Sequence, residues 1–169
     1  MPTPEFITSL RRTVGHDLLW LSGAIGVVLR GPEERRELLM VRRSDTGVWT
    51  PICGIVEPGE CPDRTVVREA REEAGVDIEV ERFLGLNAGP AMTYPNGDRC
   101  QFLDHAFVCR WVGGEPEVGD DESSAVGWFP VDALPPMPMG DQHARTVAAA
   151  LAPAGEPFMT ERGVPTTGR

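Results

Sequence analysis

The sequence predicts a single α/β (α+β) domain, in which two or three helices flank a mixed β-sheet of six or seven strands. The first observation is that short β-rich runs follow one another along the chain, separated by turns that contain glycine and proline. The second is that three segments show helical rather than alternating patterns. The third is that 169 residues, 41% of them hydrophobic, suffice for one domain with a proper core.

The chain begins with a predicted helical extension, which we place at residues 1–19. Within it, residues 4–15 predict a short amphipathic helix, because apolar side chains recur there at helical spacing and Gly15 follows as a stop. Residues 24–29 are apolar without polar alternation and predict a well-buried strand. Residues 38–41 predict a second strand after a charged turn.

The middle of the chain, residues 54–76, reads GIVEPGECPDRTVVREAREEAGV. Pro58 and Gly59 form a turn dipeptide. Pro62 suits the first helical position, where its missing N–H costs nothing, and Cys61 stands before it at the N-cap. Gly75 is the expected C-terminal stop. This stretch therefore predicts a turn followed by a helix.

The second half of the chain predicts further strands, a hairpin and a closing helix. Residues 76–86 and 101–111 are strand-like, and the latter is apolar on both pleat faces, as in a central strand. Between them, Asn96 and Gly97 predict a type I′ hairpin turn. An acidic loop then leads into a short strand, and residues 140–151 predict the helix. The domain thus covers residues 20–152, and residues 153–169, rich in Pro, Gly and Thr, are expected to be mostly disordered.

The chain is acidic, with a formal net charge of −10. Such a charge argues against a general electrostatic grip on a nucleic acid polymer or on an anionic membrane. A phosphate-containing small molecule would also be repelled unless metal ions neutralised it. We therefore expect no nucleic acid and no membrane partner.

The four cysteines match no zinc-binding spacing, and the first residues lack the long apolar core of a signal peptide. Reduced thiols in the cytosol are therefore the favoured interpretation, which predicts a cytoplasmic protein. No apolar run approaches the length needed to span a bilayer. The oligomeric state stays open, a homodimer included.

Three glutamates of the middle helix, Glu69, Glu72 and Glu73, fall within about 100° of arc, because positions three and four apart share a helix face. Small apolar side chains fall on the opposite side and can pack on the domain. A cluster of hard oxygen ligands is what Mg²⁺ or Mn²⁺ binds. The alternative interpretation is a solvated acidic helix face.

The wider spacing favours the metal site. Residues 54–76 fill every fixed position of the pattern G-x5-E-x7-R-E-U-x-E-E-x-G-U, where U is aliphatic or small. This pattern resembles the Nudix box and is complete. The resemblance covers about residues 20–151 and implies the Nudix-type α/β/α sandwich with a mixed sheet. It also implies hydrolysis of a nucleoside diphosphate linked to another moiety.

The resemblance also implies roles for the box residues. Glu72 and Glu73 are implied metal ligands, and Glu69 is implied to be either a third ligand or the base that takes a proton from water. Arg68 is implied to orient a carboxylate, with Glu60 or Glu69 as its partner, since an arginine fork suits that geometry. We therefore expect a catalytic group formed by these residues, with Mg²⁺ or Mn²⁺ as cofactor.

Outside the box, the resemblance implies a metal ligand in the backbone carbonyl of Cys53 and a further acid from a distal loop, for which we choose Glu122. Arg42, at the end of the strand before the box, and Tyr94, at the hairpin, are candidate substrate-binding residues. The alternatives are a solvated acidic loop around Glu122, a solvated strand end at Arg42 and a purely structural role for Tyr94.

The leading functional prediction is thus a pyrophosphohydrolase of the Nudix kind. Substrates of the ADP-ribose or nucleotide-sugar type and nucleoside triphosphates remain open, because the residues after the box do not decide between them. The alternative from another class is a catalytically silent Nudix-fold sensor that binds a nucleotide and a protein partner. All box acids are present in this chain, which favours the enzyme.

Overall fold

The computed structural model describes residues 3–137, 142–161 and 164–165. Its helices are α1 (Glu5–Val14), α2 (Pro62–Ala74) and α3 (Gln142–Leu151), with a short 3-10 helix, η1 (Glu33–Arg35). Its strands are β1 (Leu19–Arg30), β2 (Glu37–Arg43), β3 (Trp49–Thr50), β4 (Ile52–Ile55), β5 (Asp77–Ala88), β6 (Met92–Thr93), β7 (Arg99–Gly113), β8 (Ser123–Pro130), β9 (Phe158–Glu161) and β10 (Val164–Pro165).

The sheet is mixed, as predicted, and runs in the order β10-β9-β5-β7-β1-β2-β3. Strand β7 is central: it pairs in parallel with β1 and antiparallel with β5. Strands β4, β6 and β8 pair with β1, β7 and β2 respectively. Strand β1 is one continuous element, so the predicted strand at residues 24–29 is the inner part of a longer one.

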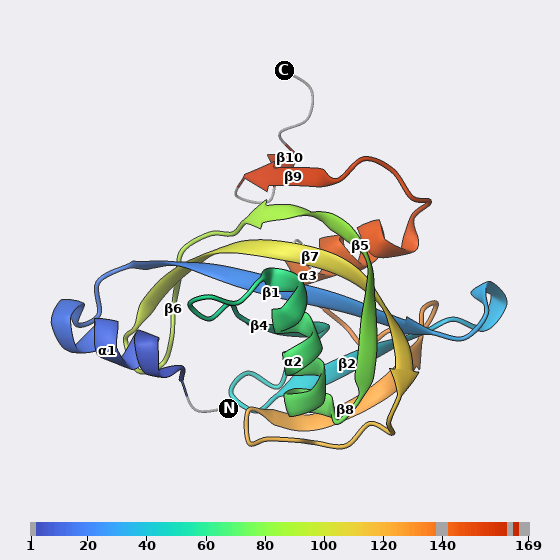
Figure 1. Cartoon of the computed structure of the whole chain (residues 1–169), viewed down its shortest axis with the longest axis horizontal. Coiled ribbons are helices and arrows are strands. Elements are labelled where there is room, and N and C mark those ends of the chain that lie inside the picture. Colours follow the sequence, from blue (N-terminus) through green and yellow to red (C-terminus); the bar gives the residue numbers. More distant parts are fainter. Residues whose placement is uncertain (1–2, 138–141, 162–163, 166–169) are drawn as a thin grey trace.

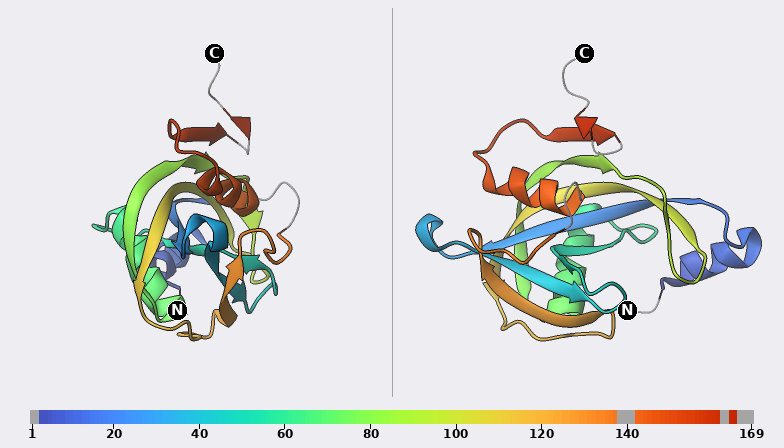
Figure 2. Two further views of the ribbon diagram at one scale, coloured as in Figure 1. Left: turned by 90° about the vertical axis from the view of Figure 1, so that its right-hand side faces the viewer. Right: turned by 180° about the vertical axis from the view of Figure 1, so that it is seen from behind.

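Two hydrophobic clusters fill the space on the two sides of the sheet. One joins β1 and β7 to α2 through Val66, Ala70 and Ala74. The other joins the opposite side of the sheet to α3 through Val147 and Ala150. Accordingly, α2 lies in front of the sheet in Figure 1, and α3 lies in front in the reverse view of Figure 2. The predicted α/β/α sandwich is confirmed.

Helix α2 begins and ends where the sequence predicts. Pro62 is its first residue, and Cys61 is an N-cap that makes no side-chain capping bond. Gly75 adopts the left-handed conformation with φ 67°, and its N–H donates to the carbonyl of Arg71 at 3.1 Å. The loop before β8 covers this helix end, because the N–H of Gly119 donates to the carbonyl of Glu73 at 3.2 Å.

The β6–β7 hairpin differs from its predicted turn. The N–H of Gly97 donates to the carbonyl of Tyr94 at 2.9 Å, so Pro95 and Asn96 are the central residues of the turn. A type I′ turn needs positive φ at both central residues, and proline cannot supply it. Gly97 is instead the fourth residue of the turn, with φ 90°.

The C-terminal segment, predicted to be mostly disordered, contains strands β9 and β10 in its described part. Strand β9 pairs in parallel with residues 85–88 of β5. Phe158 is partly buried against the cluster beneath α3 and sits where Gly85 has no side chain, because a Cβ on Gly85 would lie 2.6 Å from the phenylalanine ring. Pairing with β5 makes residues 158–161 a strand, which the composition of this segment does not reveal. Residues 162–163 and 166–169 lie outside the described residues.

All four cysteines are free thiols, in agreement with the expected reduced state. Within the described part of the chain, no helix is long and apolar enough to cross a membrane.

Candidate active site

The first catalytic candidate, Glu69, is positioned by the close approach of α2 to β4. Gly54 lies in β4 opposite Ala24 of β1, and so it belongs to a strand and not to the turn expected from the sequence. A Cβ on Gly54 would lie 2.0 Å from Oε1 of Glu69. Only glycine leaves room for the carboxylate at this point, which explains why the box begins with this residue.

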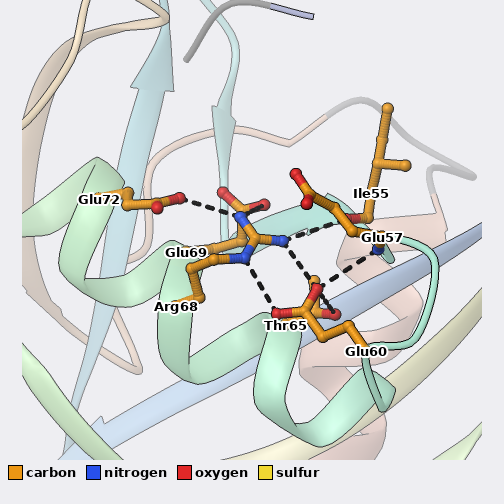
Figure 3. A network of polar contacts seen from close by, with 7 residues as sticks. All are labelled: Ile55, Glu57, Glu60, Thr65, Arg68, Glu69 and Glu72. Carbon is orange, nitrogen blue, oxygen red and sulfur yellow. Dashed lines mark hydrogen bonds and ion pairs between the residues drawn. The ribbon is translucent and has the colours of Figure 1, made fainter. Parts of the chain in front are cut away.

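Arg68 is held by Glu60 through a two-pronged ion pair (Figure 3). Its Nε donates to Oε1 of Glu60 and its Nη2 to Oε2, both at 3.0 Å. Thr65 donates its hydroxyl to the same Glu60 carboxylate at 2.8 Å. Because both oxygens of Glu60 are engaged, the plane of the guanidinium is fixed.

The same guanidinium reaches two of the candidate metal ligands. Its Nη1 donates to Oε1 of Glu69 at 2.8 Å and to Oε2 of Glu72 at 2.9 Å. Its Nη2 also donates to the backbone carbonyl of Ile55 at 3.2 Å. Arg68 thus contacts both of its predicted partners, Glu60 and Glu69, and adds Glu72 as a third.

The three glutamates do not form an exposed acidic face. Glu69 is 6% exposed and Glu73 is 5% exposed, and both lie on the side of α2 that packs on the domain. Only Glu72 keeps substantial contact with solvent. Helical periodicity assigned the acids to the outer face. In the structure, the side-chain-free Gly54 leaves room for the carboxylate of Glu69, and Glu73 is buried on the side of α2 that packs on the domain.

Burial makes both inner carboxylates hold their protons more strongly. It raises the pKa of Glu69 to about 7, an effect that the neighbouring Arg68 reduces without cancelling. The charges of Glu72 and Glu122 raise it further. The pKa of Glu73 is raised well above its usual value, first by burial and then by the charges of Glu69 and Asp120. Without a bound cation, both carboxyls are therefore harder to ionise than the carboxyl of an exposed glutamate.

This donor set fits a hard divalent cation. Oε2 of Glu73 is buried and has no hydrogen-bond partner among the described residues, and an orphaned carboxylate oxygen is a ready ligand for such an ion. In the described structure no three acidic, histidine or cysteine side chains already surround one point. Since Arg68 engages Glu69 and Glu72, a cation would have to compete with its Nη1 for their oxygens.

The acidic loop before β8 approaches these carboxylates, as the choice of Glu122 anticipated. The N–H of Ser44 donates to the carbonyl of Glu122 at 2.7 Å, and the hydroxyl of Ser44 donates to that of Asp121 at 2.8 Å. The charge of Glu122 acts on Glu69, and that of Asp120 acts on Glu73. Both acids are thus near the box, and a metal-binding role for Glu122 stays a prediction.

Cys53 lies in β4, opposite Ile25 of β1 and directly before Gly54. Its thiol donates to the carbonyl of Pro51 at 3.3 Å, and burial raises the pKa of the thiol, so this group stays neutral. The backbone of Cys53 hydrogen-bonds to the carboxylate of Glu73. The residue therefore adjoins the acids, and metal binding by its own carbonyl remains a prediction.

Of the two arginines at the end of β2, it is Arg43 that shares the electrostatic surroundings of the acids. Its charge acts on Glu73 and on Tyr94, and it forms an ion pair with Asp45 at 2.9 Å. Arg42, the predicted substrate-binding residue, is exposed and donates its Nε to the carbonyl of Gly47 at 3.1 Å. Strand alternation separates the two side chains, but the sequence did not show which of them faces α2.

Tyr94, the second predicted substrate-binding residue, is half-buried where the β6–β7 hairpin begins. It packs in a small cluster with Ile7 of α1 and with Ile55, the residue after Gly54. Burial raises the pKa of its hydroxyl, and the charge of Arg43 acts in the opposite direction. The structure therefore places Tyr94 beside the strand that carries the box glycine, within reach of the charge of Arg43.

Comparison with known proteins agrees with this geometry. The family model for the NUDIX domain matches residues 20–151. The NAD-capped RNA hydrolase NudC of Pseudomonas putida is 36% identical over 123 residues, which cover 72% of this chain and 40% of that protein. The chain thus spans about 40% of the length of this curated relative.

Solved structures show the same fold. The MutT NUDIX hydrolase from Burkholderia pseudomallei superposes with a TM-score of 0.57 at 26% identity, over 78% of this chain and 98% of that one. An ADP-ribose pyrophosphatase from Streptococcus suis superposes with a TM-score of 0.63 at 24% identity, over 83% of this chain and 98% of that one.

Proposed function

The chain belongs to the Nudix family, and from this premise we propose that it is a metal-dependent pyrophosphohydrolase. Its substrate would be a nucleoside diphosphate linked to another moiety, cleaved at the phosphoanhydride bond. The observation that carries the proposal is the buried Oε2 of Glu73, which has no partner within the described structure and stands in a complete box of acids. A buried, unpaired carboxylate is costly unless a cation joins it.

Within this proposal the residues of the box have different roles. Glu72 and Glu73 would hold Mg²⁺ or Mn²⁺, and Glu69 would act as a third ligand or as the base. A bound ion supplies charge neutralisation for the phosphates and lowers the pKa of a water molecule. Arg68, fixed by Glu60, holds the carboxylates of Glu69 and Glu72 in place and so orients them for these roles.

We also propose that Arg43, whose charge acts on Glu73, meets a substrate phosphate. Its ion pair with Asp45 would keep the guanidinium pointing in one direction. Tyr94 and Arg42 remain candidates for contacts to the rest of the substrate. Phosphoanhydride cleavage depends mainly on positioning and electrostatic stabilisation, which suits such an arrangement.

The substrate class divides into small molecules and capped RNA. The Pseudomonas putida relative is named as an NAD-capped RNA hydrolase. The match to this chain covers 40% of that protein. The net charge of −10 disfavours binding of a polyanion. We therefore propose a small nucleotide substrate, of the ADP-ribose or nucleotide-sugar type or a nucleoside triphosphate.

The test is a product-resolved assay with Mg²⁺. The protein is incubated separately with ADP-ribose, a nucleotide sugar, a nucleoside triphosphate and an NAD-capped oligoribonucleotide, each with and without EDTA. We expect release of a nucleoside monophosphate from a small substrate and loss of this activity on chelation. Tight nucleotide binding without turnover of any substrate would instead favour the sensor. Turnover that survives exhaustive chelation would contradict the metal-dependent mechanism.

A further inference from the structure

Helix α1 lies outside the residues that match the family model, and it is tied to the β6–β7 hairpin by one arginine. Figures 1 and 2 show the helix beside the end of this hairpin. Arg11 donates Nη2 to the carbonyl of Arg99 at 2.7 Å, and Nη1 to the carbonyls of Gly15 at 3.0 Å and Asp17 at 2.6 Å. Its side chain is 12% exposed although it carries a full charge.

The hairpin also supplies the counter-charge. Nε of Arg11 lies 3.3 Å from Oδ1 of Asp98, the residue that follows the turn. The same oxygen lies 2.8 Å from Nδ1 of His16. Asp98 in turn accepts a hydrogen bond from Asn96 at 3.0 Å, and its carbonyl accepts one from the N–H of Tyr94 at 2.8 Å. Arg11 therefore fixes the residue that closes the turn around Tyr94.

The apolar side of α1 reinforces this contact. Ile7 is 4% exposed and belongs to the cluster that contains Tyr94 and Ile55. The carbonyl of Ile55 accepts a hydrogen bond from Arg68, and the preceding residue, Gly54, contacts Glu69. One small cluster thus joins the N-terminal helix to the hairpin and to the strand next to the catalytic carboxylates.

We propose that Arg11 is a positioning residue: by tying α1 to the β6–β7 hairpin it holds Tyr94 against Ile55 of β4, where the tyrosine hydroxyl contacts the substrate. The part of the proposal that concerns substrate rests on the proposed function. The N-terminal extension then forms part of the substrate-binding wall, although it lies outside the matched residues. Its effect should fall on substrate binding, because Arg11 does not contact the box carboxylates in the described structure.

The experiment compares Arg11→Ala with Arg12→Ala, a matched control because Arg12 is exposed on the same helix and has the same charge. Tyr94 is the single tyrosine of the chain, so ultraviolet titration of tyrosinate reports on this residue alone. In Arg11→Ala we expect the pKa of Tyr94 to fall toward about 10, the value of an exposed tyrosine. Arg12→Ala should titrate like the wild type.

The kinetic readout uses ADP-ribose and Mg²⁺. We expect Arg11→Ala to raise KM by about tenfold with kcat nearly unchanged, as for the loss of one substrate hydrogen bond. Tyr94→Phe should raise KM similarly. The double variant should be no worse than the poorer single variant, because both changes break the same contact.

Wild-type titration and wild-type KM in a folded Arg11→Ala protein would overturn the proposal. If that variant does not fold, Asp98→Asn serves instead, since it weakens the ion pair and leaves the bonds of Arg11 to main-chain carbonyls. We then expect smaller changes in the same direction. The absence of any change in the Tyr94 titration and in KM would overturn the proposal. A wild-type protein that turns over no substrate refutes the proposed function, whereas the Tyr94 titration still decides whether Arg11 holds the hairpin.

Discussion

The carboxylate of Glu69 lies against Gly54, so that a Cβ on residue 54 would stand 2.0 Å from Oε1 and 2.2 Å from the carboxyl carbon. Gly54 of β4 pairs with Ala24 of β1. Strand β4 therefore cannot move away from Glu69 without breaking its pairing with β1. The helix is likewise fixed by the packing of Val66 and Ala70. A side chain at residue 54 would therefore have to displace the glutamate.

We predict that Gly54→Ala removes most of the activity, because the added methyl group forces Glu69 out of its position. Overpacking at such a site costs about 1–3 kcal/mol in the free energy of unfolding. The measurements are turnover with Mg²⁺ and a thermal melt. Gly155→Ala is the control, since a Cβ there meets no heavy atom within 4 Å. A Gly54→Ala protein with wild-type turnover would show that Glu69 does not need its present position.

The sequence predicted the architecture and the box, because both depend on local patterns such as strand runs, helix caps and the fixed spacing of residues 54–76. It misjudged the burial of Glu69 and Glu73. Helical periodicity assigns acidic residues to solvent, and only the contact with Gly54 of another element shows that they point inward. For the same reason the sequence did not show that the charge of Arg43, rather than that of Arg42, acts on Glu73. Strand alternation places the two side chains on opposite faces of β2 but does not say which face meets the helix.

A second prediction concerns the pH dependence of stability without metal. The pKa of Glu69 is about 7 in the folded protein, against an ordinary value of 4.5. Between these values the folded state keeps a proton that the unfolded state has lost. The free energy of unfolding therefore falls as the pH rises through this window, by up to about 1.4 kcal/mol per pH unit for one such proton. Glu73, also raised, acts in the same direction.

Glu69→Gln should reduce this slope, and the remainder should come from Glu73. Chemical denaturation in EDTA at several pH values measures the effect. Glu79→Gln is a suitable control, because Glu79 is exposed on β5 and its side chain keeps 63% of its accessible surface. An unchanged slope in Glu69→Gln would mean that the Glu69 carboxyl titrates alike in the folded and unfolded states.

A third prediction concerns the C-terminal segment, residues 153–169. Removal of residues 153–169 should lower the melting temperature, since it removes β9 and exposes the surface of β5 and the cluster beneath α3. Phe158→Ala alone should cost roughly 1–3 kcal/mol, in line with the partial burial of its ring. Met159→Ala is the control, because Met159 on the same strand is 55% exposed. Equal melting of the truncated and full chains would show that the pairing of β9 with β5 adds no stability.

The composition of this segment does not reveal β9, because Pro, Gly and Thr surround a strand of only four residues. Such a strand has too few positions to show alternation, and its stability comes from pairing with β5, about 70 residues earlier in the chain. Phe158 packs over Gly85, which has no side chain, and no sequence pattern predicts this contact.

The last prediction compares the partly exposed Glu72 with the buried Glu73 in the absence of metal. Glu72→Gln loses the ion pair with Nη1 of Arg68, which joins residues four apart on a partly exposed helix surface and contributes about 0.3–0.5 kcal/mol. Glu73→Gln removes a buried carboxylate whose Oε2 lacks a partner within the described structure. In EDTA the first variant should therefore melt slightly below the wild type, and the second at or above it.

With Mg²⁺ in excess this order should change. A ligand at about 100 times its dissociation constant stabilises the folded state by roughly 2.7 kcal/mol. The wild type should gain that amount, whereas both variants should gain much less and lose most of their turnover, because each lacks one ligand of the ion. Thermal melts of the three proteins with and without Mg²⁺, beside the turnover assay, measure both effects. Equal Mg²⁺ shifts and equal turnover in all three would identify Glu72 and Glu73 as structural charges, and the metal-dependent mechanism would then lose its principal ligands.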